Sequence, residues 1–199
     1  IQELMSRTNC DDCHVLVKGE YNFRYAIDPF YKVKRREHDY STDEVRERTA
    51  KLLTYVQSNY GMCEDGAEAD DWCRVLMKQY QLEGKNPVVA HIDKDLNMIP
   101  GWHYHIKLKD FYYQTPEQAH YFFMKQVLIG DMASDSIPGL NKIGEVKASE
   151  KYRGARLSEM KKRAIHLWQT NAHGIQQNNP EESYDTYKER IARMFKSVN

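Results

Sequence analysis

The pattern of apolar and polar positions in the first third of the chain predicts a strand followed by a helix. Residues 12–18 form a short apolar run with β-branched side chains, which predicts a buried strand that ends at Gly19. Residues 41–44 are typical of a helix cap, and the apolar positions after them recur at helical spacing until Gly61. A loop separates the two predicted elements.

The rest of the chain adds further helices and strands. Helical periodicity from 67 to 80 is followed by the apolar run 88–92, which predicts a fully buried parallel strand. A further short strand is predicted near 102–106, and after Pro116 the pattern becomes helical. Strands that alternate with helices indicate an α/β domain with a central parallel sheet.

Composition limits the classes of protein to which the chain can belong. Its 199 residues suffice for one sizeable core, or for a core domain with a small helical appendage. Charged residues make up 29% of the chain, and no segment is apolar for long enough to span a membrane. The 29 basic residues balance the 29 acidic ones, so any affinity for nucleic acid must come from local clusters of Lys and Arg. The first residues resemble the middle of a helix and no export signal, so we expect the polypeptide to begin upstream.

Acidic residues gather at the start of the helix predicted from 67. Glu68 and Asp71 are three residues apart, on nearly the same helix face, and Asp70 lies beside them. Two interpretations are equally open for this motif alone. The acids are either metal ligands or charges that interact favourably with the helix dipole, worth about 0.3 to 1 kcal/mol each.

Two further acidic clusters favour a metal site. Asp93 and Asp95 directly follow the strand 88–92, at the strand end where open α/β sheets bind ligands. Asp131 and Asp135 lie just before a Gly-rich turn. Carboxylate oxygens suit Mg²⁺ or Mn²⁺ better than zinc, and two such ions about 4 Å apart are a common means of phosphodiester hydrolysis. The sequence therefore predicts two divalent cations and phosphoryl chemistry.

Histidines offer a weaker alternative site. His91, His103 and His105 could act as general acids or ligands, but histidines at strand ends and in aromatic stretches are more often structural. No serine or cysteine with a neighbouring base is evident. Nucleophilic catalysis is therefore not predicted.

Two segments have the character of nucleic-acid contacts. Residues 137–148 predict a Gly-containing turn between two helices, which presents backbone N–H groups to a phosphate, although a plain helix connection would look similar. Basic residues follow closely behind: Lys142, Lys147, Lys151, Arg153 and Arg156. In residues 21–40, aromatic side chains alternate with cations, a mixture that suits single-stranded nucleic acid or an aromatic surface packed on the core.

These motifs stand in a recognisable order along about residues 13–150. The segments that carry it are Asn22 to Arg24, Asp28 to Lys32 with Arg35, Glu68 to Asp71, Asp93 to Asp95, Gly130 with Asp131, Pro138 with Gly139, and Ile143 with Gly144. The ordered combination resembles the 5′ nuclease family, which includes the 5′-3′ exonuclease domain of bacterial DNA polymerase I and phage flap endonucleases and exonucleases. Each motif by itself is weak, and the combination is specific.

The resemblance implies a PIN-like α/β fold with a central, mostly parallel sheet, a helical arch within 21–60 and a helix-three-turn-helix that binds DNA. It divides the chain into a nuclease core, 1–130, and a C-terminal helical region, 131–199. The implied metal ligands are Glu68, Asp70, Asp71, Asp93 and Asp95, with Asp131 and Asp135 at the second site. The implied catalytic cations are Lys32, Arg35 and Arg24, and the implied DNA-binding residues are Gly139, Lys142, Gly144 and Lys147.

The sequence also departs from the family pattern. The family's first strand, with its metal-binding Asp, has no counterpart, so we expect at least one acid of the site to lie outside these residues. The acid expected near Val17 to Gly19 is absent, and Glu20 could substitute. The spacing from Asp131 to Asp135 is one residue longer than usual, Ser136 replaces Asn, and Lys142 replaces the first Gly of the turn.

The predicted function is that of a Mg²⁺- or Mn²⁺-dependent 5′ nuclease in DNA replication or repair. Its expected partners are DNA with 5′ ends or flaps and single-strand/duplex junctions, with no membrane contact. We expect a monomer in the cytoplasm of a bacterium or of a phage-infected host. Two alternatives stay open: a non-catalytic protein of the same fold that binds branched DNA, and a PIN-like ribonuclease.

Overall fold

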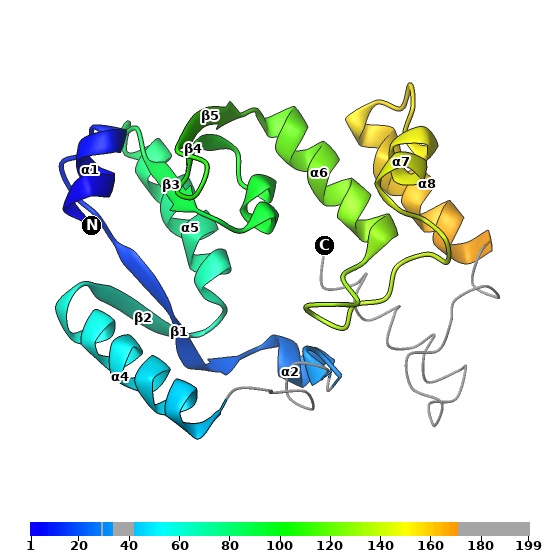
Figure 1. Cartoon of the computed structure of the whole chain (residues 1–199). Helices are drawn as coiled ribbons and strands as arrows, with labels where there is room; N and C mark the ends of the chain where they lie inside the picture. Colours follow the sequence, from blue (N-terminus) through cyan, green and yellow to red (C-terminus); the bar gives the residue numbers. More distant parts are fainter. Residues whose placement is uncertain (29, 34–41, 171–199) are drawn as a thin grey trace. The chain divides into compact units, whose positions relative to one another are not determined.

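A computed structural model describes residues 1–28, 30–33 and 42–170 (Figure 1). The chain divides into two compact units, which are described separately. Unit 1 comprises Ile1–Asn22 and Tyr40–His120, and unit 2 comprises Phe23–Asp39 and Tyr121–Asn199. Among the described helices, none combines the length and the apolar character that a membrane span requires.

Unit 1 contains all five described strands. Its elements in chain order are α1 (Gln2–Thr8), β1 (Val15–Asn22), α4 (Asp43–Asn59), β2 (Gly61–Gly66), α5 (Ala69–Leu82), β3 (Val88–His91), the short 3-10 helix η1 (Lys94–Met98), β4 (Gly101–His105) and β5 (Asp110–Gln114). Helix α6 (Pro116–Ile129) begins at the end of this unit. Strands β1 and β2 pair in parallel, as do β3 and β4, whereas β5 is antiparallel to β4. The predicted α/β fold with parallel strands is therefore confirmed.

The strands differ from the prediction in three respects. Strand β1 continues through Gly19, because the register shifts between Lys18 and Asn22 and glycine tolerates such an irregularity. Strands β2 and β5 were not predicted. Within the described residues the sheet is in two parts, of order β1-β2 and β3-β4-β5, so that β3 is an edge strand and Ala90 is exposed instead of buried.

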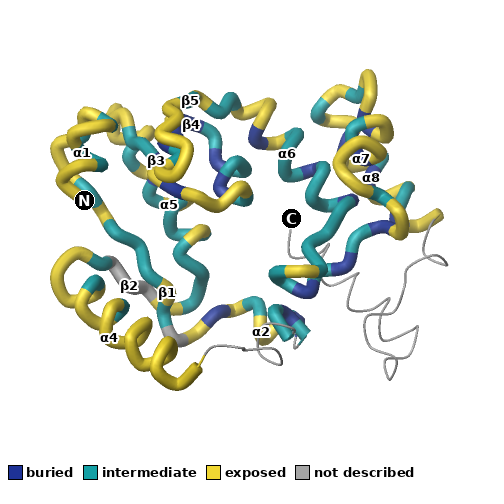
Figure 2. Tube along the Cα trace, in the orientation of Figure 1, coloured by how far each residue is buried: buried dark blue, intermediate teal, exposed yellow. Residues whose placement is uncertain are grey.

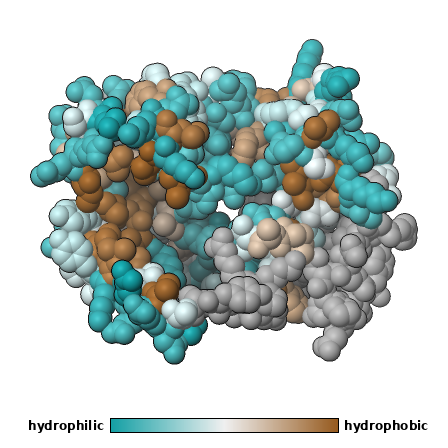
Figure 3. All heavy atoms as spheres, viewed as in Figure 1, coloured by the Kyte–Doolittle hydropathy of each residue, from teal (hydrophilic) through white to brown (hydrophobic). Residues whose placement is uncertain are grey.

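Helix α4 begins where the cap-like residues predicted it. The Thr42 hydroxyl accepts a hydrogen bond from the Val45 N–H at 3.3 Å and so caps the first turn. No residue of this helix is buried, and it is exposed along almost its whole length in Figure 2. Hydrophobic side chains also reach the surface of unit 1 near β1 and α5 (Figure 3). The small core of the unit consists of Met77, Val89, Leu96 and Ile99.

Unit 2 is a helical unit with a larger core. It contains α2 (Arg24–Ile27), most of α6, α7 (Glu145–Lys151) and α8 (Leu157–Thr170). Two of its buried aromatic side chains also bond to α6: the Tyr152 hydroxyl donates to the Met124 carbonyl, and the Trp168 ring N–H donates to the Val127 carbonyl, each at 3.1 Å. The buried core residues are Met124, Leu128, Leu140, Ala148, Tyr152, Met160, Ala164 and Trp168.

Candidate metal and nucleic-acid site

The acids at the start of α5 hold one another in place. Glu68 is the N-cap residue, and its side chain accepts from the Asp71 backbone N–H, while the Asp71 carboxylate accepts from the Glu68 N–H at 3.0 Å. This reciprocal pair is a capping box, and it satisfies two backbone donors that a helix start otherwise leaves without partners. Asp70 lies in the same turn and is exposed. The capping box gives Glu68 and Asp71 a structural role at the helix start, and their role as metal ligands stays a prediction.

Asp93 and Asp95 lie where the sequence placed them, after a parallel strand. Asp93 caps η1, and its Oδ1 accepts the Asp95 backbone N–H at 2.9 Å. The Lys94 ammonium group lies 3.2 Å from Oδ1 of Asp95 and offsets part of the local negative charge. The capping bond fixes the Asp93 side chain relative to Asp95, and both carboxylates belong to one short turn.

A network of polar side chains contacts the backbone of this turn. The buried rings of His91 and His103 contact each other at 3.0 Å, and each also bonds to a backbone carbonyl. Burial disfavours the charged form of an imidazole and lowers the pKa of both His91 and His103 below its ordinary value. Burial and these backbone hydrogen bonds agree with the structural interpretation of the two histidines. His105 lies at the end of β4, where its Nδ1 accepts the Leu108 N–H at 3.1 Å.

Lys32 and Asp135 are brought together in unit 2. The Lys32 ammonium group lies 3.6 Å from Oδ1 of Asp135, and the Tyr31 hydroxyl donates to Oδ2 at 3.3 Å. Arg24 stacks its guanidinium group over the Phe23 ring, 4.7 Å from the ring centroid. The structure thus joins a predicted catalytic cation to a predicted metal ligand. The third predicted cation, at position 35, lies outside the described residues.

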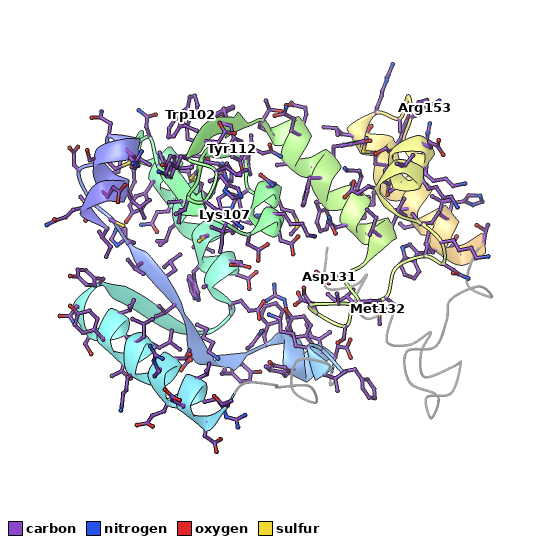
Figure 4. All side chains as sticks on the ribbon, in the orientation of Figure 1. Trp102, Lys107, Tyr112, Asp131, Met132 and Arg153 are labelled. Atoms are coloured by element: carbon purple, nitrogen blue, oxygen red, sulfur yellow. The ribbon has the colours of Figure 1, made fainter. Side chains whose placement is uncertain are left out.

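Asp131 organises the loop that follows α6 (Figure 4). Its Oδ1 accepts the Ser134 N–H at 2.8 Å, and its backbone pairs with that of Ile137 in an isolated antiparallel bridge. The Asp135 N–H donates to the Asp131 carbonyl at 3.2 Å. The two acids therefore belong to one closed loop, which agrees with their prediction as a pair.

The Gly-rich turn before α7 is closely packed at one end and open at the other. A Cβ atom on Gly139 would lie 1.8 Å from the Ile129 carbonyl oxygen, so only glycine fits there. Gly144 caps α7 and has open space around it. Lys142 adopts φ 59°, the left-handed region, and its side chain is exposed, as is that of Lys147. Lys142 in the turn and Lys147 on α7 thus present two cations to solvent near the start of this helix.

Comparison with known proteins was made at the levels of sequence and structure. No family model matches the chain, and no curated protein matches it significantly. Solved structures do match. The T5 D15 protein co-crystallised with metal ions is 16% identical, with a TM-score of 0.65 over 99% of this chain and 85% of that one.

Further structures of the phage protein agree. The bacteriophage T5 D15 flap endonuclease in a complex with DNA and metal ions is 16% identical, with a TM-score of 0.64 over 97% of this chain and 88% of that one. The T5 5′-exonuclease with bound zinc is also 16% identical, with a TM-score of 0.64 over 96% and 80%. The chain has the 5′ nuclease fold.

The 5′ nuclease fold raises the question whether these residues suit a metal ion. Among the described residues, no three His, Cys, Asp or Glu side chains are grouped as a metal site. The donor chemistry nevertheless fits a hard divalent cation, because Asp93 and Asp95 supply carboxylates from a single turn at the carboxyl end of a parallel strand. Glu68 and Asp71 supply a second acidic pair at the start of α5 in the same unit.

Two residues near the Asp93 turn were not predicted from the sequence. Tyr112 of β5 and Asn97 of η1 share a hydrogen bond of 2.6 Å, and the Tyr112 ring stacks on that of His103. The sequence feature that could have indicated this network is the cross-strand pairing of His103 with Tyr112. That pairing can be recognised only once β5 is identified as a strand. Because β5 was not predicted, neither was this network.

Proposed function

We propose that the protein is a divalent-metal-dependent 5′ nuclease that hydrolyses DNA phosphodiesters at 5′ ends or 5′ flaps. The observation that carries the proposal is the Asp93 and Asp95 turn at the carboxyl end of β3, in a fold shared with a flap endonuclease that was crystallised with DNA and metal ions. The proposed setting is DNA replication or repair in the cytoplasm of a bacterium or of a phage-infected host, with the protein acting as a monomer.

The acids have defined roles in this proposal. Two Mg²⁺ or Mn²⁺ ions would be held by the predicted carboxylates, Glu68, Asp70, Asp71, Asp93, Asp95, Asp131 and Asp135. When bound, such ions supply activation of the attacking water and stabilisation of the leaving oxygen. The capping bonds at Glu68 and Asp93 hold these side chains in fixed orientations before any ion arrives.

The basic residues would position the substrate. Lys32, Arg24 and Arg35 are the cations proposed to steer the scissile phosphate, and the paired geometry of Lys32 with Asp135 keeps its ammonium group beside an acid of the second site. Gly139, Lys142, Gly144 and Lys147 form the proposed grip on duplex DNA. Exposed lysines at a helix start bind phosphates without reading bases, which suits an enzyme that recognises structure.

The proposed division into a nuclease core, 1–130, and a DNA-gripping region, 131–199, follows from these roles. It separates the acids of α5 and η1 from the turn before α7. Both regions would be needed for cleavage, since the first supplies the acids of α5 and η1, and the second supplies Asp131 and Asp135 together with the grip on the duplex.

A cleavage assay tests the proposal directly. End-labelled 5′-flap DNA is incubated with the protein in Mg²⁺ or in EDTA, and the products are sized. We expect cleavage in Mg²⁺ alone, and a loss of about 100-fold or more on Asp93→Ala or Asp95→Ala, since loss of a group that stabilises the transition state commonly costs this much. Asp11→Ala is the matched control, because Asp11 is an exposed acid in the loop before β1.

The other outcomes identify the alternatives. DNA binding without cleavage in Mg²⁺ or Mn²⁺ would contradict the nuclease proposal and would indicate a structure-specific binding protein. Faster cleavage of a matched RNA flap would indicate a ribonuclease. Product lengths distinguish the two modes of the proposed activity, since an exonuclease releases mononucleotides or short products and a flap endonuclease releases the whole flap.

A further inference from the structure

The 3-10 helix η1 is held at both ends by two buried histidines. The His91 Nδ1–H donates to the carbonyl of Asp93, the N-cap residue, at 2.7 Å, and the His103 Nε2–H donates to the carbonyl of Ile99, the C-cap residue, at 2.8 Å. His91 is 5% exposed and His103 is fully buried. Each ring thus fixes one end of the turn that carries Asp95.

The two rings also lie in contact with each other and with a tyrosine. Nε2 of His91 lies 3.0 Å from Nδ1 of His103 and 3.2 Å from the Tyr112 hydroxyl. The same hydroxyl donates to Oδ1 of Asn97 at 2.6 Å, and the Gln114 side-chain amide donates to the Asn97 carbonyl at 3.0 Å. One polar frame, built from β3, β4 and β5, therefore holds the start, middle and end of η1.

The frame adds hydrogen bonds that so short a turn does not make by itself. A five-residue 3-10 helix makes few internal hydrogen bonds, and its carbonyls normally turn to water. Burying two imidazoles to hold such a turn costs desolvation that an aliphatic pair would avoid. What the frame provides is a fixed backbone at Asp93, whose side chain in turn accepts the Asp95 N–H.

We infer that His91 and His103 are positioning residues that hold Asp93 and Asp95 in the arrangement needed to bind a divalent cation. The inference rests on the proposed function. Neither imidazole is a proposed ligand of the cation. Their effect passes through the Asp93 and Ile99 carbonyls, so it depends on the N–H donors of the two rings and not on their charge. Groups that orient metal ligands from behind commonly change metal affinity by about 10 to 100-fold when removed.

Matched substitutions separate the donor from the bulk of the ring. His91→Leu removes the donor and keeps an apolar side chain, whereas His91→Asn keeps an N–H close to the position of Nδ1. His103→Leu and His103→Gln form the same comparison for Nε2. His120→Leu is the control, because His120 is an exposed histidine on α6 in the same unit.

The readout is Mn²⁺ binding to the whole chain, without DNA, measured by electron paramagnetic resonance, with the Tm recorded for each variant. We expect His91→Leu and His103→Leu to weaken Mn²⁺ binding by about 10-fold or more. The two amide variants and His120→Leu should stay within about three-fold of the native affinity, since they retain the donors or lie outside the frame. A folded His91→Leu protein with native Mn²⁺ affinity would overturn the inference.

If the leucine variants do not fold, a second variant tests whether the frame affects Mn²⁺ affinity. Tyr112→Phe removes only the hydroxyl that anchors Asn97, and we expect a loss in Mn²⁺ affinity of about three-fold or more. Unchanged affinity in this variant would overturn the inference. If the native chain itself binds no Mn²⁺, this result contradicts the proposed function. If the native chain binds Mn²⁺ and every variant binds it equally, the positioning role alone fails.

Discussion

Lys32 and Asp135 are joined twice, through their side chains and through their backbones. The ammonium group lies 3.6 Å from the carboxylate, and the Lys32 N–H donates to the Asp135 carbonyl at 2.9 Å. Lys32 holds a left-handed φ of 55°, a conformation that costs a non-glycine residue about 1 to 2 kcal/mol, so this contact must offset backbone strain. The relationship ties the segment before position 34 to the loop that contains Asp131, within unit 2.

A double-mutant cycle should show that this pair stabilises the protein. Lys32→Met, Asp135→Asn and the double variant are compared by urea unfolding. We expect a coupling free energy of about 1 kcal/mol, because the side chains are only 17% and 23% exposed and water screens them less than a surface pair. The control cycle uses Lys51 and Glu47, an exposed pair on α4 for which about 0.3 to 0.5 kcal/mol is expected. A coupling no larger than that of the control would contradict the prediction.

Gly139→Ala should destabilise the protein severely. The added Cβ would lie 1.8 Å from the Ile129 carbonyl oxygen and 2.8 Å from the Gly130 nitrogen, so two backbone segments would have to move apart. We expect a loss of about 3 kcal/mol or more in the free energy of unfolding, measured with urea. Gly144→Ser is the control, since Gly144 has open space around it and serine is favoured at an N-cap. Equal stability of the two variants would refute the close approach.

Lys142→Gly should change stability and DNA affinity in opposite directions. Glycine adopts the φ of 59° without strain, so we expect a gain of up to about 1 kcal/mol in unfolding free energy. If the turn grips phosphates, the same change should weaken binding of flap DNA and reduce the slope of log affinity against log salt by about 1. Lys142→Ala, which removes the charge and keeps the strain, should weaken binding without the gain in stability. Unaltered binding by both variants would remove Lys142 from the DNA contact.

The buried His103 should make stability fall as the pH falls. Burial lowers the pKa of His103 in the folded protein, so between that value and about 6.5 the unfolded chain binds more protons than the folded one. The free energy of unfolding should therefore decrease as the pH falls below about 6.5. His103→Gln should flatten part of this dependence in urea unfolding at several pH values, whereas His120→Gln should not. Parallel pH profiles for native protein and His103→Gln would contradict the prediction.

Local patterns were sufficient wherever an element and its ends are fixed by neighbouring residues. The cap at Thr42, the helix that starts after Glu68 and the acids that follow β3 all depend on hydrogen bonds between residues a few positions apart. The order of these motifs also indicated the 5′ nuclease fold, which the structural comparison confirmed. Strand β2, in contrast, has the sequence Gly-Met-Cys-Glu-Asp-Gly, and it becomes a strand only by pairing with β1, more than 40 residues earlier.

The sequence by itself therefore determined the fold class and placed the candidate acids at the ends of helices and strands, because short-range periodicity and capping encode those positions. Only the tertiary structure decided which residues meet. It paired Lys32 with Asp135, brought Gly139 against Ile129, and set His91, His103 and Tyr112 behind the Asp93 turn. These contacts depend on strand pairing and on close approach between distant segments, which no local pattern specifies.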